Sequence, residues 1–215
     1  MLLYIMRHGE TDYNVAGRLQ GWLEEPLNEK GRELARVTGA GLRDVHFELC
    51  ITSPLARAYE TAKIVLRSSQ NEAATLITDD RLKEISFGAW EGLCCTKANF
   101  ELPCDHFEEF FTAPFDMEPF PGGENVKMVC ERTAEFYREL IQKEEWADKT
   151  ILISTHGCAM RALLNQVYED KNNFWHTHVP FNCAVNIVEV KNGIATLLEE
   201  DKIYYDDALC IERYK

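Results

Sequence analysis

Two arginines and two histidines stand at or just beyond the ends of short apolar runs in this chain. Arg7 and His8 follow the first run, Arg57 lies in the segment after the second, and His156 follows the fourth. Guanidinium groups bind phosphoryl oxygens through charge and paired hydrogen bonds, and an imidazolium adds further positive charge. A neutral imidazole is also a competent nucleophile near neutral pH, because its ordinary pKa is about 6.5. Together these side chains indicate phosphoryl chemistry in which the protein supplies the positive charge and no metal takes part.

Glycine and glutamate residues complete this candidate site. Gly9 and Gly157 each follow one of the two histidines, where the missing side chain lets the backbone approach a phosphate closely. Glu84 lies just beyond the third apolar run, and its carboxyl group could donate a proton to a leaving oxygen. A glutamate at a strand edge is often only solvated, so a purely structural role for Glu84 is the alternative.

The apolar runs have the length of buried strands, and helical patterns alternate with them. Strands are expected at 2–6, 49–52, 76–78 and 151–154. Helices are expected from the cap Asn28 to Leu42, from Ser53-Pro54 through Val65, over 124–143 and over 158–168. This alternation predicts an α/β fold with a mostly parallel sheet. In such sheets ligands bind beyond the carboxyl ends of the strands, where the candidate side chains lie.

Two further strands are expected near the end of the chain. Segments 184–190 and 194–198 are joined by Lys191-Asn192-Gly193. Asn-Gly is a strong signal for a tight turn, so these segments predict a β-hairpin.

The candidate residues stand in blocks that closely resemble the histidine phosphatase superfamily, in its phosphoglycerate mutase-like branch. The blocks are, in chain order, 7–11 with Asn14 and 17–22, then 53–58 with 61–62, then 82–88, 121–124 and 154–157. The resemblance extends from residue 2 to about residue 168. It implies a three-layer α/β/α sandwich whose mostly parallel sheet contains one antiparallel strand, with a helical and loop insertion over the site.

The resemblance also implies a role for each candidate residue. His8 matches the nucleophile that becomes a phosphohistidine, and Glu84 matches the proton donor that later assists water. The residues that match the phosphate pocket are Arg7, Arg57, His156 and Asn14. Ser53 is expected to support this pocket from behind. The implied activity needs no cofactor.

Length and charge narrow the remaining possibilities. A chain of 215 residues predicts a single domain, 1–215, in which we expect residues of about 92–123 to form a lid, called the lid segment below. The net charge of −13 argues against a nucleic acid or an anionic membrane as partner, because both require a basic face. The expected partner is a small-molecule phosphomonoester, and the oligomeric state stays open.

Cysteine and histidine usage adds two expectations. The eight cysteines show no repeated spacing, no secretory signal is recognised and no apolar stretch is long enough to cross a bilayer, so we expect a cytoplasmic protein with free thiols. The pair His176 and His178 could indicate a metal site. Because no cysteine or carboxylate stands beside them in the sequence, we expect a structural role and no metal.

The composition around the lid segment favours hydrolysis over phosphoryl transfer. Residues 98–126 contain seven acidic side chains and six phenylalanines but no lysine or arginine. In the resembling family, cofactor-dependent mutases place an arginine pair and a lysine in this insertion, and they usually carry asparagine where this chain has Cys158. We therefore expect a phosphatase with an acidic and aromatic lid. A mutase, or a non-catalytic protein that binds a phosphorylated ligand, remains the alternative, and the physiological substrate stays open.

Overall fold

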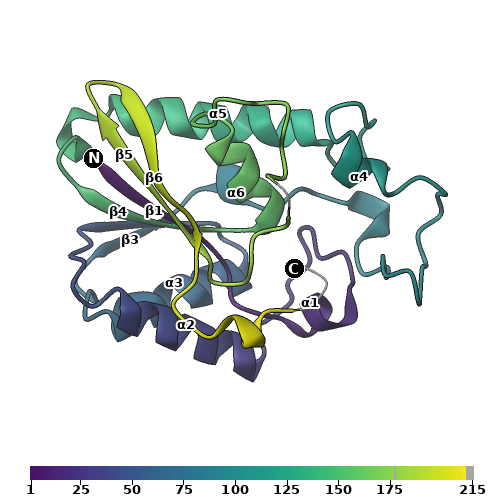
Figure 1. Cartoon of the computed structure of the whole chain (residues 1–215), viewed down its shortest axis with the longest axis horizontal. Helices are drawn as coiled ribbons and strands as arrows, with labels where there is room; N and C mark the ends of the chain where they lie inside the picture. The colour runs from purple at the N-terminus through teal and green to yellow at the C-terminus, as the bar shows by residue number, and fades with distance from the viewer. Residues whose placement is uncertain (177, 212–215) are drawn as a thin grey trace.

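A six-stranded sheet forms the centre of the computed structural model, which describes residues 1–176 and 178–211 (Figure 1). Its strand order is β3-β2-β4-β1-β5-β6. The strands are β1 (Leu2–Arg7), β2 (Leu49–Thr52), β3 (Thr75–Thr78), β4 (Thr150–Thr155), β5 (Val185–Lys191) and β6 (Ile194–Lys202). The first four are parallel, β5 is antiparallel to β1, and β6 is antiparallel to β5. Since β6 again runs in the direction of β1, the mostly parallel sheet with one antiparallel strand is confirmed.

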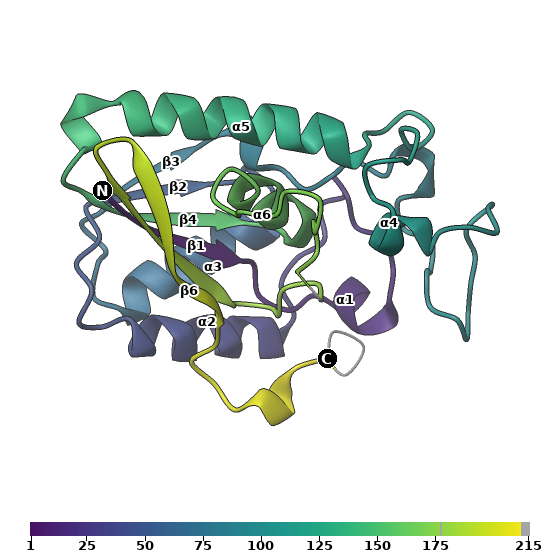
Figure 2. The same ribbon diagram turned by 45° about the horizontal axis from the view of Figure 1, so that its top comes forward.

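Helices cover both faces of the sheet, which makes the three expected layers (Figure 2). The longer helices are α2 (Glu29–Gly41), α3 (Ala56–Ser68), α5 (Val126–Gln142) and α6 (Gly157–Leu164). Successive side chains of a strand point to opposite faces, and β1 shows this directly. Leu3 and Ile5 pack in one core with residues of α5 and α6, whereas Tyr4 and Met6 pack in a second core with residues of α2 and α3. The carboxyl end of β1 is therefore held between two cores.

Turn chemistry fixes the hairpin as expected. Asn192 and Gly193, which join β5 to β6, have φ values of 52° and 76°. Positive φ at both central residues matches the right-handed twist of the two strands, and asparagine and glycine adopt it at the lowest cost.

Two predicted helix starts are wrong. Helix α3 begins at Ala56 without a side-chain cap, because Ser53 does not cap it and its hydroxyl instead lies 2.8 Å from Nε2 of His156. Helix α5 begins at Val126 rather than residue 124, since Asn125 is the cap and its side chain accepts from the backbone of Met128.

The lid segment contains little regular structure, and its phenylalanines form much of a third core. Among the described residues the two short α-helices are α1 (Asp12–Ala16) and α4 (Glu109–Thr112), and 3₁₀ turns occur at Asp80–Leu82, Gly88–Trp90, Glu144–Trp146 and Asp207–Leu209. Phe107, Phe110 and Phe120 are buried against Phe87 and Val129. Phe111, by contrast, is 45% exposed. The segment is therefore packed onto the end of the sandwich near α4.

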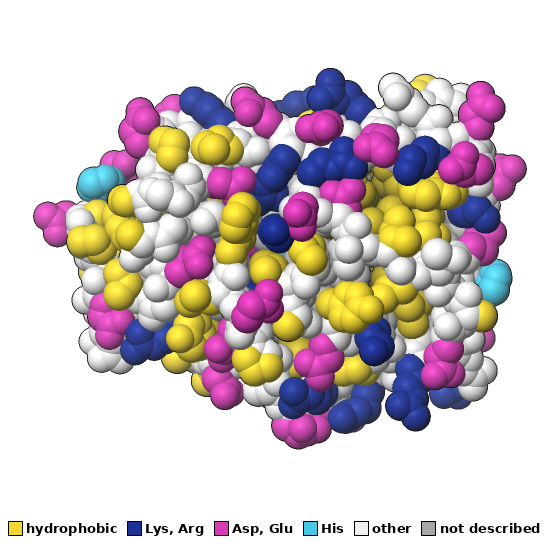
Figure 3. All heavy atoms as spheres, turned by 180° about the vertical axis from the view of Figure 1, so that it is seen from behind, with side chains coloured by type: hydrophobic (Ala, Val, Ile, Leu, Met, Phe, Trp, Pro, Cys, Tyr) yellow, Lys and Arg dark blue, Asp and Glu magenta, His cyan; other side chains and the backbone are white. Residues whose placement is uncertain are grey.

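The surface carries both signs of charge. Figure 3 shows acidic side chains interspersed with lysine and arginine side chains on the face opposite to that of Figure 1, with hydrophobic side chains between them. None of the helices in the described part of the chain is both long and apolar enough to cross a membrane. The eight cysteines are all free, as expected.

Candidate active site

His8 follows the last residue of β1, and its ring is fixed by its own backbone neighbourhood. Nδ1 of His8 lies 2.6 Å from the carbonyl oxygen of Gly9, so Nδ1 carries the proton and donates it. The lone pair of the neutral ring is then on Nε2, as a nucleophile requires. The backbone nitrogen of His8 donates to the carbonyl of Thr155 at 2.9 Å, which ties this position to the end of β4.

The surroundings of His8 keep the imidazole neutral. The side chain is 2% exposed, and burial is the main cause that lowers the pKa of His8 well below its ordinary value. The positive charges of Arg57 and Arg7 lower this pKa further. Both effects disfavour the imidazolium, because the charged form loses solvation and is repelled by the guanidinium groups.

His156 lies beside His8 and is held from the other side by Ser53. The two histidine ring centroids are 5.1 Å apart. Nε2 of His156 lies 2.8 Å from Oγ of Ser53, while Nδ1 is buried without a hydrogen-bond partner in the part of the chain that the structure describes. Burial, followed by the charge of Arg57, lowers the pKa of His156 well below its usual value. Ser53 thus lies against the Nε2 side of the His156 ring.

Arg57 projects from the first turn of α3 and is fully buried. Its Nη1 and Nη2 atoms donate to the carbonyl oxygens of Leu23 and Gly21 at 2.8 and 2.7 Å. Burial lowers the pKa of Arg57 to about 10, a value at which the guanidinium is still charged near neutral pH. Arg7 is fixed in a comparable way, because its Nη1 donates to the carbonyl of Pro180. Backbone carbonyls thus accept hydrogen bonds from the guanidinium groups of both Arg57 and Arg7.

Glu84 is held against the first turn of α6. Its Oε1 accepts from the backbone nitrogens of Ile85 and Ala159, both at 3.0 Å, and its Oε2 lies 3.3 Å from that of Cys158. These contacts hold the carboxylate of Glu84 at the first turn of the helix that follows His156. The alternative that Glu84 is merely solvated does not fit this arrangement.

Asn14 enters the site from α1, where it is part of a capping box. Its Oδ1 accepts from the backbone nitrogen of Thr11 at 3.1 Å, and Thr11 in turn caps the backbone of Asn14. Oδ1 also accepts from Nδ2 of Asn182 at 3.2 Å. These donors fix the orientation of the Asn14 amide group, because they require its oxygen to face them. Asn14 also lines the cavity described next.

A cavity of about 440 Å³ joins the candidate residues to the lid segment. One end is lined by Arg7, His8, Asn14, Arg57 and Glu84. The other end is lined mainly by the aromatic residues Phe87, Phe107, Phe110, Phe111 and Trp175. Nε1 of Trp175 donates to the carbonyl of Phe110 at 2.7 Å, which ties the loop before β5 to the lid segment. The cavity therefore has a polar, cationic end and an aromatic end.

The expectation of an acidic lid over the site is wrong, although the aromatic part holds. None of the seven carboxylates of 98–126 lines the cavity, whereas Arg18 and Lys97 do. Glu101 points instead to Arg18, with an Nη1 to Oε2 distance of 2.9 Å. Backbone geometry explains the difference, because the phenylalanines of the lid segment fill the third core and the site wall, which leaves the carboxylates outside.

Gly9 and Gly157, which follow the two histidines, differ in what a side chain at each position would contact. A Cβ atom at Gly9 would lie 2.6 Å from the carbonyl oxygen of Gly31, so helix α2 could not approach β1 with any other residue there. A Cβ atom at Gly157 would lie 3.6 Å from Nε of Arg7 and 3.7 Å from Oε2 of Glu84, in ordinary contact with both. Only Gly157 thus opens space within the site.

The sequence did not single out several residues that position the site. Arg132 donates to the carbonyls of Arg81, Lys83 and Glu84 and pairs with Glu124 at 2.8 Å. It thereby fixes the segment that carries Glu84, and it explains why a Pro-Gly-Gly-Glu block lies beside the site. Asn182 is the other such residue. Its place after a proline in an irregular loop gave no periodic signal that could have identified it.

His176 and His178 face carboxylates on β6. Nδ1 of His176 lies 3.5 Å from Oε1 of Glu200, and Nε2 of His178 lies 3.5 Å from Oδ2 of Asp201, around the buried Arg161. Thr177 lies outside the described residues. Across residues 1–176 and 178–211, no group of three or more histidine, cysteine or acidic side chains could hold a metal ion.

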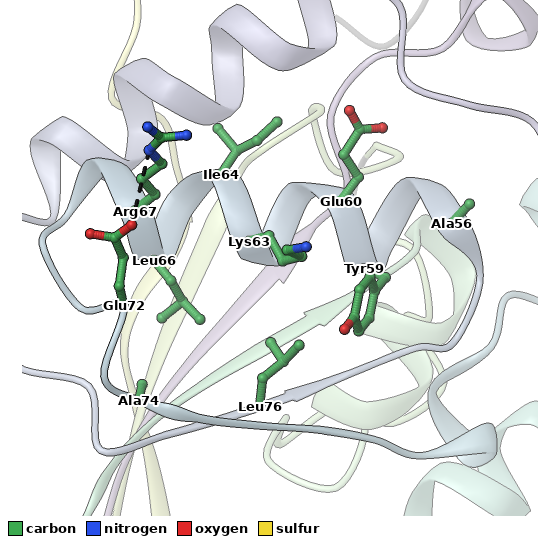
Figure 4. Close-up of a pocket in the computed structure, with 10 residues that line it drawn as sticks. All are labelled: Ala56, Tyr59, Glu60, Lys63, Ile64, Leu66, Arg67, Glu72, Ala74 and Leu76. Atoms are coloured by element: carbon green, nitrogen blue, oxygen red, sulfur yellow. Dashed lines mark ion pairs between the residues drawn. The ribbon is translucent and has the colours of Figure 1, made fainter.

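A second, larger cavity of about 710 Å³ lies away from the candidate site, between α3 and β3 (Figure 4). Tyr59 and Leu76 point toward each other across it, and the charged side chains Glu60 and Arg67 stand on its rim. Arg67 pairs loosely with Glu72, at 3.9 Å. This groove is lined by residues of α3, β3 and the turn between them, and it contains none of the histidines and arginines of the candidate site.

The three-layer fold and this cluster of histidines, arginines and a glutamate agree with the family that the sequence resembles. Residues 3–201 match the model of the histidine phosphatase superfamily (branch 1), and the chain belongs to this family.

Its relatives include both mutases and phosphatases. The chain is 34% identical to 2,3-bisphosphoglycerate-dependent phosphoglycerate mutase 2 of Gloeobacter violaceus, over 77% of this chain and 75% of the relative. It is 32% identical to phosphoserine phosphatase 1 of Hydrogenobacter thermophilus, over 80% and 79% of the two chains. Among solved structures, Bacillus stearothermophilus YhfR superposes with a TM-score of 0.84 at 32% identity, covering 94% of this chain and 97% of that chain. The family is thus established, and the reaction within it is not.

Proposed function

We propose that the chain is a phosphomonoester hydrolase that acts through a phosphohistidine on His8 and uses no metal. The observation that carries this proposal is the hydrogen bond from Nδ1 of His8 to the carbonyl of Gly9. Combined with the lowered pKa of His8 beside two guanidinium groups, it leaves Nε2 unprotonated on a side chain that lines the cavity. Such a ring is a nucleophile without a separate general base.

In the first step, the phosphoryl group binds between Arg7 and Arg57, and Nε2 of His8 attacks the phosphorus. A bond forms between Nε2 and phosphorus as the bond from phosphorus to the leaving oxygen breaks. Glu84, which enters this step protonated, gives its proton to that oxygen. Nδ1 of His156 is buried without a partner in the described structure, and in this mechanism it would donate to a phosphoryl oxygen while Ser53 donates to Nε2.

In the second step, a water molecule attacks the phosphohistidine. Glu84, now a carboxylate, takes a proton from the water as the bond between phosphorus and Nε2 breaks. Inorganic phosphate leaves, and both His8 and Glu84 return to their starting forms. The two steps balance as the hydrolysis of a phosphomonoester to an alcohol and phosphate.

The aromatic end of the cavity supports a preference for apolar or aromatic leaving groups. Phe107, Phe110 and Phe111 provide apolar surface where the leaving group would lie. The acidic side chains of 98–126 lie outside the cavity, so they give no support for a cationic leaving group. That the whole of 1–215 works as one domain with residues 92–123 as its lid stays a prediction.

A mutase is the second candidate, and one observation favours it. Arg18 and Lys97 line the cavity, where they could bind the carboxylate or second phosphate of a phosphoglycerate. Arg18, however, forms an ion pair with Glu101. Of these two cations, only Lys97 has no carboxylate partner among the described residues. One such exposed cation is a weak basis for holding a bisphosphate, so hydrolysis is the better-supported function.

The experiment compares both reactions on the same protein. Interconversion of phosphoglycerates is measured with 2,3-bisphosphoglycerate present, beside the release of phosphate from an aryl phosphate. We expect hydrolysis to be faster, to be abolished in His8→Ala and to be unchanged in the control His46→Ala, which changes an exposed histidine. Faster interconversion would identify a mutase. No turnover in either assay, with phosphate binding retained, would identify a non-catalytic binding protein.

A further inference from the structure

Asn182 lies in the loop between α6 and β5 and contacts the nucleophile segment at three points. Its Nδ2 atom is 3.1 Å from the carbonyl oxygen of His8, 3.2 Å from that of Gly9 and 3.2 Å from Oδ1 of Asn14. The side chain is 4% exposed, so water does not compete for these acceptors. A single amide group therefore connects β1's end to α1.

The carbonyl of Gly9 links this amide to the reacting ring. The same oxygen accepts the proton of Nδ1 of His8 at 2.6 Å. A donor from Asn182 orients this carbonyl, and the carbonyl in turn fixes both the tautomer and the rotation of the imidazole. The line of contact runs from Asn182 through Gly9 to Nε2, the atom that attacks phosphorus.

The third acceptor links Asn182 to the phosphate pocket. Oδ1 of Asn14 receives hydrogen bonds from Thr11 and Asn182, so the amino end of Asn14, the donor that a phosphate oxygen needs, is at the opposite end of the amide. If Asn182 no longer donated, the amide of Asn14 would lose one of the contacts that set this orientation.

The backbone around Asn182 is itself held in place. The nitrogen of Cys183, a residue with a φ of 58°, donates to the carbonyl of Arg7 at 3.1 Å. The hydroxyl of Tyr205 donates to the carbonyl of Asn182. Tyr205 lies beyond residues 3–201, the part that matches the family model.

We propose that Asn182 is a positioning residue for phosphoryl transfer: it aims His8 through the carbonyl of Gly9 and orients Asn14, and Tyr205 holds it from the segment after β6. This inference rests on the proposed phosphohistidine mechanism. A displacement of the nucleophile by about 1 Å lowers the rate roughly 100-fold. Loss of Asn182 should therefore slow mainly the chemical step, the phosphorylation of His8.

Two matched pairs of variants test the proposal. Asn182→Ala is compared with Asn186→Ala, which removes a buried asparagine whose side chain bonds, among the described residues, to Met160 and Asp201. Tyr205→Phe is compared with Tyr204→Phe, whose hydroxyl makes no hydrogen bond among the described residues. The readout is the single-turnover rate of phosphorylation of His8, measured with thermal unfolding of each variant.

We expect Asn182→Ala to slow phosphorylation by ~10–100-fold and Tyr205→Phe by several-fold, while both controls stay within about 3-fold of wild type. In Asn182→Asp, a carboxylate faces the three oxygen atoms that accept from the amide in wild type. We expect its phosphorylation rate, relative to that of wild type, to rise as the pH falls, because the carboxyl group then gains a proton and can donate again. A role in stability alone would not produce this pH dependence.

The outcomes separate this inference from the function on which it rests. If wild type forms no phosphohistidine, the proposed function fails and the positioning role fails with it. If wild type forms it and Asn182→Ala is phosphorylated no more slowly than Asn186→Ala, only the positioning role is overturned. If Asn182→Ala does not fold, Tyr205→Phe decides, and a rate equal to that of Tyr204→Phe overturns the proposal.

Discussion

The carboxylate of Glu84 lies 3.0 Å from the backbone nitrogen of Ala159, in the first turn of the helix that follows His156. Glu84 and His156 are thus held by one element, α6. This helix has eight residues and is entirely buried. Their relative position therefore depends on packing inside the core and not on a surface loop.

The first prediction concerns Glu84→Gln. Glutamine keeps the size of the side chain but cannot deliver the proton, so we expect hydrolysis of alkyl phosphates to slow by ~10²–10⁴-fold. Phosphorylation of His8 by 4-nitrophenyl phosphate should slow far less, because nitrophenolate leaves without a proton. Burst kinetics with the two substrate types measure the difference. Equal losses for both substrates would argue that Glu84 only positions α6.

The second prediction concerns the dependence of stability on pH. His8 and His156 are buried with lowered pKa values, so the unfolded chain binds more protons than the folded chain below about pH 6.5. Their contribution is complete above that pH and is lost as the pH falls, by at most ~1.4 kcal/mol per pH unit for each group. We expect the Tm of wild type to drop between pH 7 and pH 5.

Variants assign this drop to the two rings. His8→Gln and His156→Gln should each flatten the decline in Tm below pH 6.5, whereas His46→Gln, at an exposed position, should leave it unchanged. The rate of phosphorylation should behave differently from stability: because neutral His8 persists as the pH falls, this rate should not decline at the ordinary pKa of histidine. Parallel Tm curves for all three variants would contradict the buried neutral histidines.

The third prediction concerns Arg57→Lys. Lysine retains the charge but loses the fork that donates to the carbonyls of Leu23 and Gly21. We expect kcat/KM to fall by ~10²–10³-fold, because the variant loses a fixed hydrogen-bond donor to the charge that develops in the transition state. Arg67→Lys, on the same helix but exposed, serves as the control. An unchanged kcat/KM in Arg57→Lys would mean that charge alone suffices there.

The fourth prediction concerns leaving-group selectivity. Phe111 and Phe100 are each 45% exposed, but only Phe111 lines the cavity. Phe111→Ala should lower kcat/KM for aryl phosphates relative to small alkyl phosphates by roughly 5–30-fold, the loss expected for about 1–2 kcal/mol of aromatic contact. Phe100→Ala should not change this ratio. A similar change in both variants would place the leaving group elsewhere.

Comparison of sequence and structure shows which features local patterns can predict. Arg7 ends a strand, and His8 and His156 directly follow strands. Because parallel strands end at one edge of a sheet, the convergence of these side chains could be predicted from the apolar runs. The prediction that Ser53 caps a helix is wrong, because no local pattern shows that its hydroxyl instead contacts His156, which is distant in the sequence.

The lid segment shows the limit of composition as a guide. Counting its acidic side chains predicted an acidic cavity wall, but composition does not state which side chains point inward. Arg18 precedes the segment by many residues, and its pairing with Glu101 depends on tertiary contact. Asn182 was missed for the same reason, since all three of its acceptors belong to the opposite end of the chain.

The most direct test of the central claim is to trap the intermediate. Wild type is mixed with a ³²P-labelled aryl phosphate and quenched within one turnover, and the labelled peptide is mapped. We predict label that is stable to base, labile to acid and located on His8, with nearly one equivalent per chain and none in His8→Ala. Turnover at the wild-type rate with no label on His8, or an equally active His8→Ala, would contradict the account.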